Sequence, residues 1–175
     1  MKIVAFAIVT FAFLGLEPGA MGKADRYRMA IEEKGTPFAE EIDIDEDEDV
    51  EVFRVPAHND VDGADFYQDF KMRLTVTRIP SRKVCYISKM DPSLSAPGKL
   101  KADFDRVNAQ PTPLSVVSSS HLVAVTGPAN RLVLTKAIID FCGALPIYNT
   151  ETIKGVAANG NGTSSKLHIV NLVIC

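Results

Sequence analysis

Two cysteines in unlike settings constrain the fold of this chain more than any other feature. Cys85 lies in the run Val84 to Ile87, which belongs to an alternating pattern typical of a β-strand. Cys142 closes an apolar pattern of helical spacing and is followed at once by Gly143, a residue that favours the cap of a helix. Such a pair, far apart in the sequence, can join a sheet to a helix. The chain is therefore expected to combine both kinds of element.

The N-terminus has the pattern of a secretory signal peptide. Lys2 supplies a positive charge, and an apolar run follows from Ile3 to Leu16. This run is shorter than the roughly 20 apolar residues that cross a bilayer as a helix, so a cleaved signal is favoured over a short membrane anchor. We expect a signal peptide over residues 1–22 and a secreted chain that meets a membrane only if the signal is not cleaved.

Export places the three cysteines in an oxidising compartment, where disulfides form. An odd number leaves one cysteine over, and the final residue, Cys175, is the expected odd one. It could also pair two copies of the chain, so a homo-oligomer is possible. About 150 residues remain after the signal, which is enough for one domain with a core of its own.

The net charge of −3 hides a strong asymmetry. Between Glu40 and Glu51, nine of twelve residues are acidic, which leaves +6 on the remainder of the chain. Because a block of like charge repels itself, we expect residues 39–49 to be a disordered linker within a pro-region over residues 23–49. A sharper hypothesis is that this block folds back onto a basic face that includes Lys71 and Lys101.

Periodicity predicts an α+β domain over residues 50–149. Strands are expected at residues 50–55, 70–77, 84–90, 122–126 and 146–149, and turn residues fill positions 59–63. One helix begins at Pro97, and a second carries the apolar stripe Leu134, Ile138 and Phe141. The order of strands and helices is typical of a mixed sheet rather than a doubly wound one.

Three motifs of this domain resemble the BRICHOS family. They are Gln68-Asp69-Phe70, Cys85-Tyr86-Ile87 and Phe141-Cys142-Gly143-Ala144-Leu145-Pro146-Ile147-Tyr148. The last run, in its place after a helix, is the most specific of the three. The layout of signal, linker, domain and C-terminal peptide is also similar to that of family precursors, including secreted annelid antimicrobial-peptide precursors.

The resemblance implies a mixed sheet of about five strands flanked by two helices, and an intramolecular chaperone role. It also implies a disulfide between Cys85 and Cys142, which on loop entropy alone is worth about 4 kcal/mol. Asp69 matches the characteristic aspartate of the family. We expect Asp69 to be a structural, pH-sensitive group, and the alternative is a turn aspartate bonded to local backbone.

Tyr86 matches the aromatic residue beside the first cysteine of the family. Together with Phe70, Met72, Leu74 and Val76, it is expected to line a client-binding face of the sheet. The alternative is that such a stripe is core beneath a helix.

The C-terminal residues 167–175 have the composition of an aggregation-prone strand. They are rich in β-branched residues and contain no Pro, Gly, Lys, Arg, Asp or Glu. A tether over residues 150–166 precedes them and carries a glycosylation sequon at Asn161 and one basic residue for processing, Lys166. The segment is expected to be the client of its own domain, which could also bind other β-prone peptides; the alternative is a native strand of the sheet of the domain.

The sequence therefore predicts a secreted proprotein whose domain shields its C-terminal segment from aggregation. The alternative is the precursor of a host-defence peptide with the domain as a processed pro-region, although the tail lacks the usual positive charge. An enzyme is not expected, because Ser120 and His121 are adjacent on a strand and no nucleophile-elbow motif is present. The histidines lack metal-ligand spacing, and the basic cluster lacks interleaved aromatics. We expect no cofactor, no metal and no nucleic-acid partner.

Overall fold

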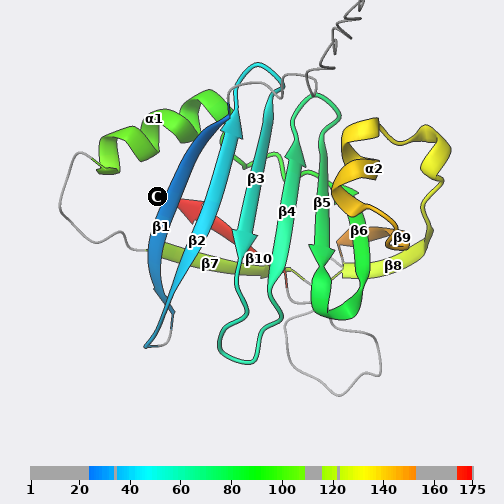
Figure 1. Ribbon diagram of the computed structural model, residues 1–175, viewed down its shortest axis with the longest axis horizontal. Coiled ribbons are helices and arrows are strands. Elements are labelled where there is room, and N and C mark those ends of the chain that lie inside the picture. The colour runs from blue at the N-terminus through cyan, green and yellow to red at the C-terminus, as the bar shows by residue number, and fades with distance from the viewer. Residues whose placement is uncertain (1–23, 34, 109–115, 122, 153–168, 175) are drawn as a thin grey trace, which may run out of the picture.

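The central feature of the protein is a mixed sheet of eight strands. A computed structural model describes residues 24–33, 35–108, 116–121, 123–152 and 169–174. Within these residues the strand order is β1-β2-β3-β4-β5-β6-β9-β8 (Figure 1). The strands are β1 (Asp25–Glu33), β2 (Thr36–Asp45), β3 (Val50–Val55), β4 (Ala64–Asp69), β5 (Leu74–Ile79), β6 (Val84–Lys89), β8 (Val123–Pro128) and β9 (Ile147–Thr152). All neighbours are antiparallel except β6 and β9, which are parallel.

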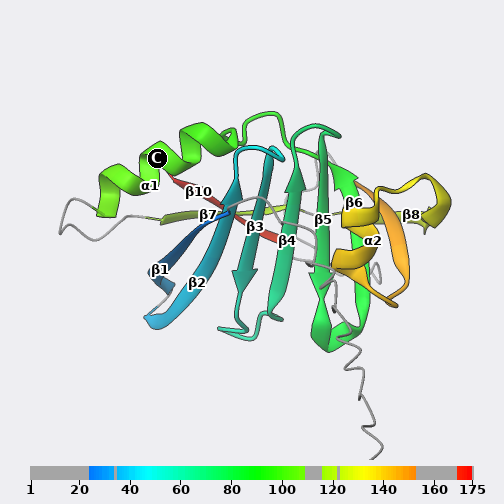
Figure 2. The same ribbon diagram turned by 45° about the horizontal axis from the view of Figure 1, so that its top comes forward.

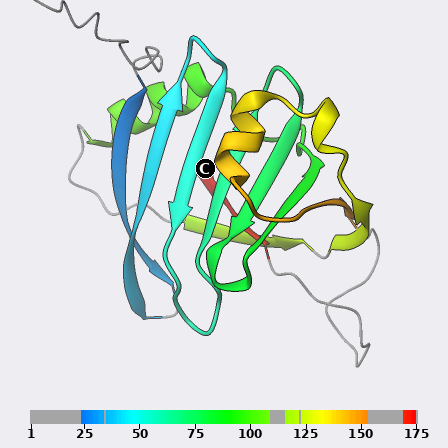
Figure 3. The same cartoon turned by 45° about the vertical axis from the view of Figure 1, so that its right-hand side comes forward.

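The two α-helices of the described residues lie on opposite faces of this sheet. Helix α1 (Pro97–Asn108) lies behind β1 and β2, whereas α2 (Lys136–Cys142) lies in front of β5 (Figure 3). Short 3₁₀-helices at Pro80–Arg82 and Arg131–Val133 complete the helical elements. The prediction of an α+β fold with two helices is confirmed.

A second sheet pairs the C-terminal strand with a strand from the middle of the chain. Strand β10 (Ile169–Ile174) is antiparallel to β7 (Val116–His121) along its full length. This two-stranded ribbon crosses the large sheet on the side of α1 (Figures 1 and 2). Residues 116–174 thus contribute strands to both sheets.

The prediction of about five strands was wrong, chiefly because β1 and β2 lie in the expected pro-region, and β2 includes part of residues 39–49, which were expected to be a disordered linker. Ile42 and Ile44 alternate with acidic residues, and both are fully buried. The acids between them lie on the other face of the strand, where Asp43 accepts hydrogen bonds from Arg26 and Arg54. Alternation and opposite charges on neighbouring strands therefore outweigh the self-repulsion of the block.

The acidic residues that follow β2 form the turn before β3 and contact basic side chains. Lys71 Nζ lies 3.2 Å from Glu48 Oε2, and Lys101 Nζ lies 3.0 Å from Glu46 Oε2. Both pairs are substantially exposed, so each contributes little to stability. The acidic block does reach these two basic residues, as an ordered turn.

A second correction concerns the strand that was expected to begin at Phe70. Residues 64–69 form β4, and Phe70 to Arg73 form the turn that connects β4 to β5. The Asp69 carboxylate accepts a hydrogen bond from the Met72 backbone N–H at 2.8 Å, and Arg73 adopts a φ of 58°. This turn chemistry outweighs the alternation of apolar residues that suggested a strand.

The sheet buries one apolar cluster on each face. The cluster on the side of α1 consists of Met29, Ile31, Ile42, Ile44, Phe53, Phe66, Ile79, Val84, Leu100, Phe104 and Val123. The cluster on the side of α2 is smaller and consists of Val76, Cys85, Ile87, Ile138, Cys142 and Ile147.

Helix α2 begins and ends where the sequence indicates. The Thr135 side chain accepts a hydrogen bond from the Ile138 backbone N–H, and Gly143 closes the helix with a φ of 57°. The disulfide between Cys85 and Cys142 is confirmed, with Cα atoms 6.0 Å apart and a sequence separation of 57. It fixes the C-terminal end of α2 to β6.

Candidate functional site

The face of the large sheet toward α1, hereafter the α1-side face, carries a row of directly paired residues, most of them bulky. Ile42 on β2 is opposite Phe53 on β3, which is opposite Phe66 on β4. The row continues through Thr77 on β5 to Tyr86 on β6. Because directly paired residues project from the same face, these five positions span five strands of one surface.

A second row of paired residues lies next to the first on the same face, and it is mostly polar and yet buried. Ile44 is opposite Glu51, which is opposite Gln68 and then Thr75. Glu51 is 1% exposed and Gln68 is 4% exposed. Neither Glu51 Oε1 nor Gln68 Oε1 has a hydrogen-bond partner in the part of the chain that is described. Buried polar atoms without partners are uncommon, so this pair marks the face as unusual.

Burial changes the protonation of the two carboxyl groups on this face. Desolvation raises the pKa of Glu51 to about 8, and the nearby negative charge of Asp49 adds to the effect. Desolvation alone raises the pKa of Glu40 to about 7. Glu51 is therefore mostly a neutral carboxylic acid at pH 7, able to donate a hydrogen bond as well as accept one.

Two elements cover the α1-side face. Helix α1 packs Leu100 and Phe104 against it, and the Phe104 ring stacks on Tyr27 with ring centroids 5.0 Å apart. The Tyr27 hydroxyl donates to Asp105 Oδ1 at 2.9 Å. The β7–β10 ribbon crosses the same side of the sheet (Figure 2). The cover thus includes the C-terminal strand of the chain.

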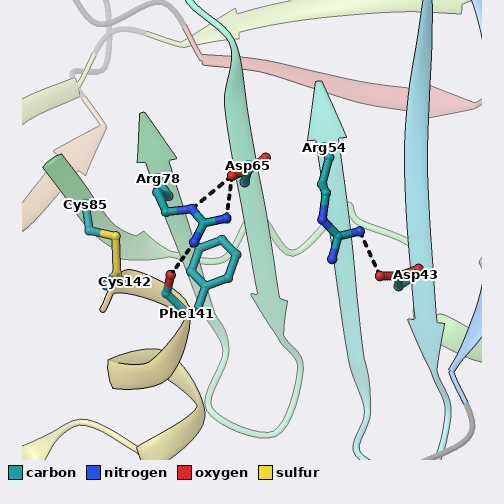
Figure 4. A network of polar contacts seen from close by, with 7 residues as sticks. All are labelled: Asp43, Arg54, Asp65, Arg78, Cys85, Phe141 and Cys142. Carbon is teal, nitrogen blue, oxygen red and sulfur yellow. Dashed lines mark hydrogen bonds and ion pairs between the residues drawn. A yellow bond between two sulfur atoms is a disulfide. The ribbon is translucent and has the colours of Figure 1, made fainter. Parts of the chain in front are cut away.

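The opposite face of the sheet is held by covalent and ionic contacts. Figure 4 shows Arg78 donating from Nε and Nη2 to Asp65 Oδ2 and from Nη1 to the Phe141 carbonyl, beside the disulfide. Further along the sheet, Arg54 Nη1 lies 2.7 Å from Asp43 Oδ2. Burial opposes ionisation of Asp43, but the hydrogen bonds from its arginine partners prevail and lower its pKa.

The residues expected to line a client-binding face do not share one surface. Tyr86 lies on the α1-side face, 6.4 Å from Tyr148 between ring centroids. Leu74 and Val76 belong to the core cluster under α2, which was the stated alternative. Phe70 and Met72 lie in the β4–β5 turn, and Met72 is 49% exposed. Of the five, only Tyr86 keeps a place on the candidate site.

Asp69 occupies the end of β4 and is 6% exposed. Its bond to the Met72 N–H is the local backbone contact that was the alternative interpretation. This contact accounts for an aspartate at the position. A pH-sensitive role for Asp69 stays a prediction.

His58 is buried, and both of its ring nitrogens lie within hydrogen-bond distance of a partner. Its Nδ1 lies 2.9 Å from the Pro56 carbonyl oxygen, and its Nε2 lies 2.8 Å from Glu33 Oε2. The ring stacks on Phe38 at 3.9 Å between centroids. His58 thereby joins the β1–β2 hairpin to the loop before β4. No signal in the sequence pairs it with Glu33, because the contact depends on β1 and β2, which were not expected as strands.

Several predicted features lie outside the described residues. These are the signal peptide over residues 1–22, the sequon at Asn161, the processing residue Lys166, the odd cysteine Cys175 and His168. For Ser120 and His121 the structure describes the backbone, which lies in β7. Within the described ranges, no helix is long and apolar enough to cross a membrane.

The fold defines a disulfide-linked α+β sheet protein whose apolar face is covered by one helix and a two-stranded ribbon. Residues 60–149 match the sequence model of the BRICHOS domain. This match covers half of the chain, and the protein belongs to the BRICHOS family. No curated protein and no solved structure matches the chain. Strands β1 to β3 precede the matched residues and extend the sheet.

Membership of the family carries a general function. BRICHOS domains serve as chaperone-like pro-regions of precursors that are typically secreted or membrane-associated. They generally bind β-prone segments of their own chain and are not generally enzymes. We therefore expect a β-prone segment bound by this domain to lie on the covered α1-side face.

Proposed function

We propose that this protein is a secreted proprotein whose BRICHOS domain acts as an intramolecular chaperone for its C-terminal residues 167–175. One observation carries the proposal: β10, which comes from this segment, pairs with β7 and crosses the α1-side face of the sheet (Figures 1 and 2). The two interpretations of this segment, as a client of the domain and as a native strand, then describe the same arrangement, because the client occupies a strand position within the molecule.

The arrangement restricts both routes by which such a strand aggregates. A strand adds to another through its unpaired backbone edge, and stacked sheets associate through dry apolar faces. Strand β7 pairs with one edge of β10 along all six residues. The ribbon crosses the large sheet on the side of α1 (Figure 2). Because the tail is tethered, its effective concentration at this face is on the order of millimolar, which favours the intramolecular contact.

The test releases the tail without removing it from the folded protein. A specific protease site is inserted within residues 156–165 of the intact, oxidised chain, and the sample is cut and passed over a size-exclusion column. We expect the cut segment to co-elute with the domain and thioflavin fluorescence to stay low. In a second sample, the cut protein is unfolded in denaturant, and the denaturant is then removed in the presence of a reductant that keeps the domain unfolded. We expect the tail to form fibres in this sample.

A matched control carries Leu172→Lys, which places a charge in the middle of the strand and should make the free tail soluble. The proposal is wrong if the cut segment of the unaltered chain leaves the column separately and forms fibres as fast as a synthetic peptide of residues 167–175. Leakage of anionic lipid vesicles caused by that peptide would instead favour the host-defence alternative.

The secretory features form part of the same proposal. We expect cleavage after residue 22, glycan at Asn161, processing at Lys166 and a Cys175 that is either free or bonded to a second chain. Intact-mass and peptide-mapping mass spectrometry of the secreted product measures all four. An Asp69→Asn variant tests the remaining prediction, because an unchanged pH profile of stability or oligomerisation would remove Asp69 as a pH-sensitive group.

A further inference from the structure

The large sheet ends in two edge strands, β1 and β8, which differ in how well they are protected from other chains (Figure 1). An edge strand offers unpaired backbone groups to any further strand, and prolines and β-bulges are common means of blocking it. Strand β8 has both, because it ends at Pro128 and its pairing with β9 is shifted between Val125 and Gly127. Strand β1 has nine residues, none of them proline, and pairs with β2 without a register shift. Within the described residues, the edge open to a further strand is therefore that of β1.

The backbone of β1 alternates between groups that face β2 and groups that face the open edge. Pro37 on β2 is the partner of Glu32 and has no N–H, so this pair cannot exchange the two hydrogen bonds of a bonded antiparallel pair. Because bonded and non-bonded pairs alternate along antiparallel strands, Arg28 and Ala30 share the setting of Glu32. The N–H and C=O groups of these three residues point away from β2 and are available to a second strand.

The side chains at these three positions form a pattern that is complementary to itself. Arg28, Ala30 and Glu32 are exposed, and the residues between them belong to the apolar cluster on the side of α1. Arg28 and Glu32 are equally spaced on either side of Ala30 and carry opposite charges. Neither has an ion pair or a side-chain hydrogen bond with another described residue, whereas Arg26 of the same strand pairs with Asp43. Two opposite charges without partners thus flank the small residue in the middle of the open strand.

We propose that β1 binds β1 of a second copy of this chain, antiparallel and with Ala30 opposite Ala30, in a two-fold dimer with one continuous sheet. In this register, Arg28 of each copy is opposite Glu32 of the other copy, which gives two symmetric ion pairs on one face. Met29 is opposite Ile31 on the other face, so the apolar clusters on the side of α1 meet there. Because both copies use the same strand, the contact closes on itself and does not extend into a fibre. The proposal goes beyond the proposed function and does not depend on it.

The same charges select the antiparallel orientation. In a parallel, in-register pair, Arg28 would be opposite Arg28 and Glu32 opposite Glu32, and like charges directly opposite each other are destabilising. Charged side chains on an edge strand usually keep other strands away. Here they exclude the parallel copy and attract the antiparallel one, and Ala30 places no bulky side chain at the two-fold axis.

The position of α1 is compatible with this two-fold axis. The helix contacts β1 near the first residues of the strand, where Tyr27 donates to Asp105 and Lys101 pairs with Asp25. A two-fold axis through the middle of β1 places the two copies of α1 on the same side of the joined sheet but toward opposite ends of β1. One strand from each copy makes a small contact, so we expect a reversible dimer whose amount depends on concentration.

The experiment reverses the two charges in the full, oxidised chain. Arg28→Glu and Glu32→Arg are made as separate variants, each with Cys175→Ala to exclude a disulfide between copies. Sedimentation velocity over a range of concentrations measures the dissociation constant of the dimer. We expect the Cys175→Ala chain to dimerise and each charge variant to dimerise at least about tenfold more weakly, because like charges then face each other twice. An equal mixture of the two variants should restore the affinity, since every facing pair again has opposite charges.

Two controls separate this contact from net charge and from folding. Lys136→Glu and Asp140→Lys change the net charge by the same amounts at exposed positions on α2, away from β1, and should leave the dissociation constant unchanged. Ala30→Pro removes a backbone N–H that points away from β2. It should weaken the dimer while circular dichroism keeps the spectrum of the folded chain, because proline is tolerated on an edge strand where the N–H faces solvent.

The proposal is overturned if the Cys175→Ala chain is monomeric at every concentration, or if the charge variants dimerise as well as the controls on α2. A mixture of the two charge variants that stays monomeric overturns it as well, because loss of affinity in the single variants would then reflect altered folding. Retained affinity in Ala30→Pro would place the dimer contact on another surface, with the same consequence. None of these results bears on whether the domain holds its own tail.

Discussion

The two faces of the sheet are stabilised in different ways. On the face toward α2, a disulfide joins Cys85 to Cys142, and Arg78 is bonded to partners on two elements. On the α1-side face the contacts are apolar packing, and two buried oxygen atoms lack partners among the described residues. The disulfide and the hydrogen bonds of Arg78 thus fix the face toward α2. The α1-side face combines the larger apolar cluster with this buried polar pair.

The largest effect on stability is expected when the disulfide on the face toward α2 is removed. Cys85→Ala combined with Cys142→Ala should lower the free energy of unfolding by about 4 kcal/mol, because the unfolded chain regains the freedom of a long loop. Urea unfolding followed by circular dichroism measures the loss. Cys175→Ala is the matched control and should leave the unfolding midpoint in place. Equal midpoints for the double variant and the unaltered chain would contradict a stabilising role for the disulfide.

The next test asks whether the acidic N-terminal strands belong to the core of the α1-side face. Ile42 is fully buried, so Ile42→Ala should cost about 3 kcal/mol through lost burial and a residual cavity. The neighbouring residue Glu41 is exposed on the opposite face, and Glu41→Ala should change stability by less than about 0.5 kcal/mol. Urea unfolding compares the two. Similar small effects would mean that β2 is dispensable to the fold, as a linker would be.

The regions that could be predicted from the sequence are those in which local signals agree. Around Cys142, the apolar stripe, the Gly143 cap and the following strand all point to α2 and its exit. The strand at residues 50–55 follows from simple alternation, and β3 has those bounds. In each case neighbours in the sequence determine the element.

The regions that could not be predicted depend on distant partners. The acidic β2 forms because Arg26 and Arg54 on adjacent strands pair with its residue Asp43. It also forms because Ile42 and Ile44 pack into the core cluster on the side of α1. Glu51 is buried beside Gln68, which lies on a neighbouring strand. Charge content and periodicity carry no information about such contacts, so a linker and a simple strand were expected there.

The pH dependence of stability should reflect the α1-side face. A carboxyl with a raised folded pKa keeps its proton where the unfolded chain, with the ordinary value of 4.5, has lost it. Its contribution is therefore full below about pH 4.5 and is lost as the pH rises through about 7 for Glu40 and about 8 for Glu51. Stability should therefore fall as the pH rises from 5 to 9.

Unfolding midpoints at pH 5, 7 and 9 measure this slope, and Glu51→Gln should flatten it because an amide does not titrate. The exposed Glu48 provides the control, since Glu48→Gln should keep the slope of the unaltered chain. A rise in stability with pH over this range would show that Glu51 and Glu40 are ionised in the folded protein.

The smallest effect is expected on the face toward α2, at Arg78. Its guanidinium donates twice to Asp65 and once to the Phe141 carbonyl, and its central carbon lies 4.7 Å from the centroid of the Phe141 ring. The side chain is one-third exposed, so Arg78→Ala should cost only about 1.5 kcal/mol. Arg78→Lys should lose nearly as much, because an ammonium group keeps the charge but not the fork that reaches both partners.

Arg26 is the matched control for this prediction, because it also pairs with an aspartate but its side chain is 80% exposed. Arg26→Ala should change the unfolding midpoint very little. Full stability in Arg78→Lys would show that charge alone holds this contact. Among the described residues, the covalent bond between Cys85 and Cys142 would then be the directional link from α2 to the sheet, and the contrast between the two faces would rest on that bond.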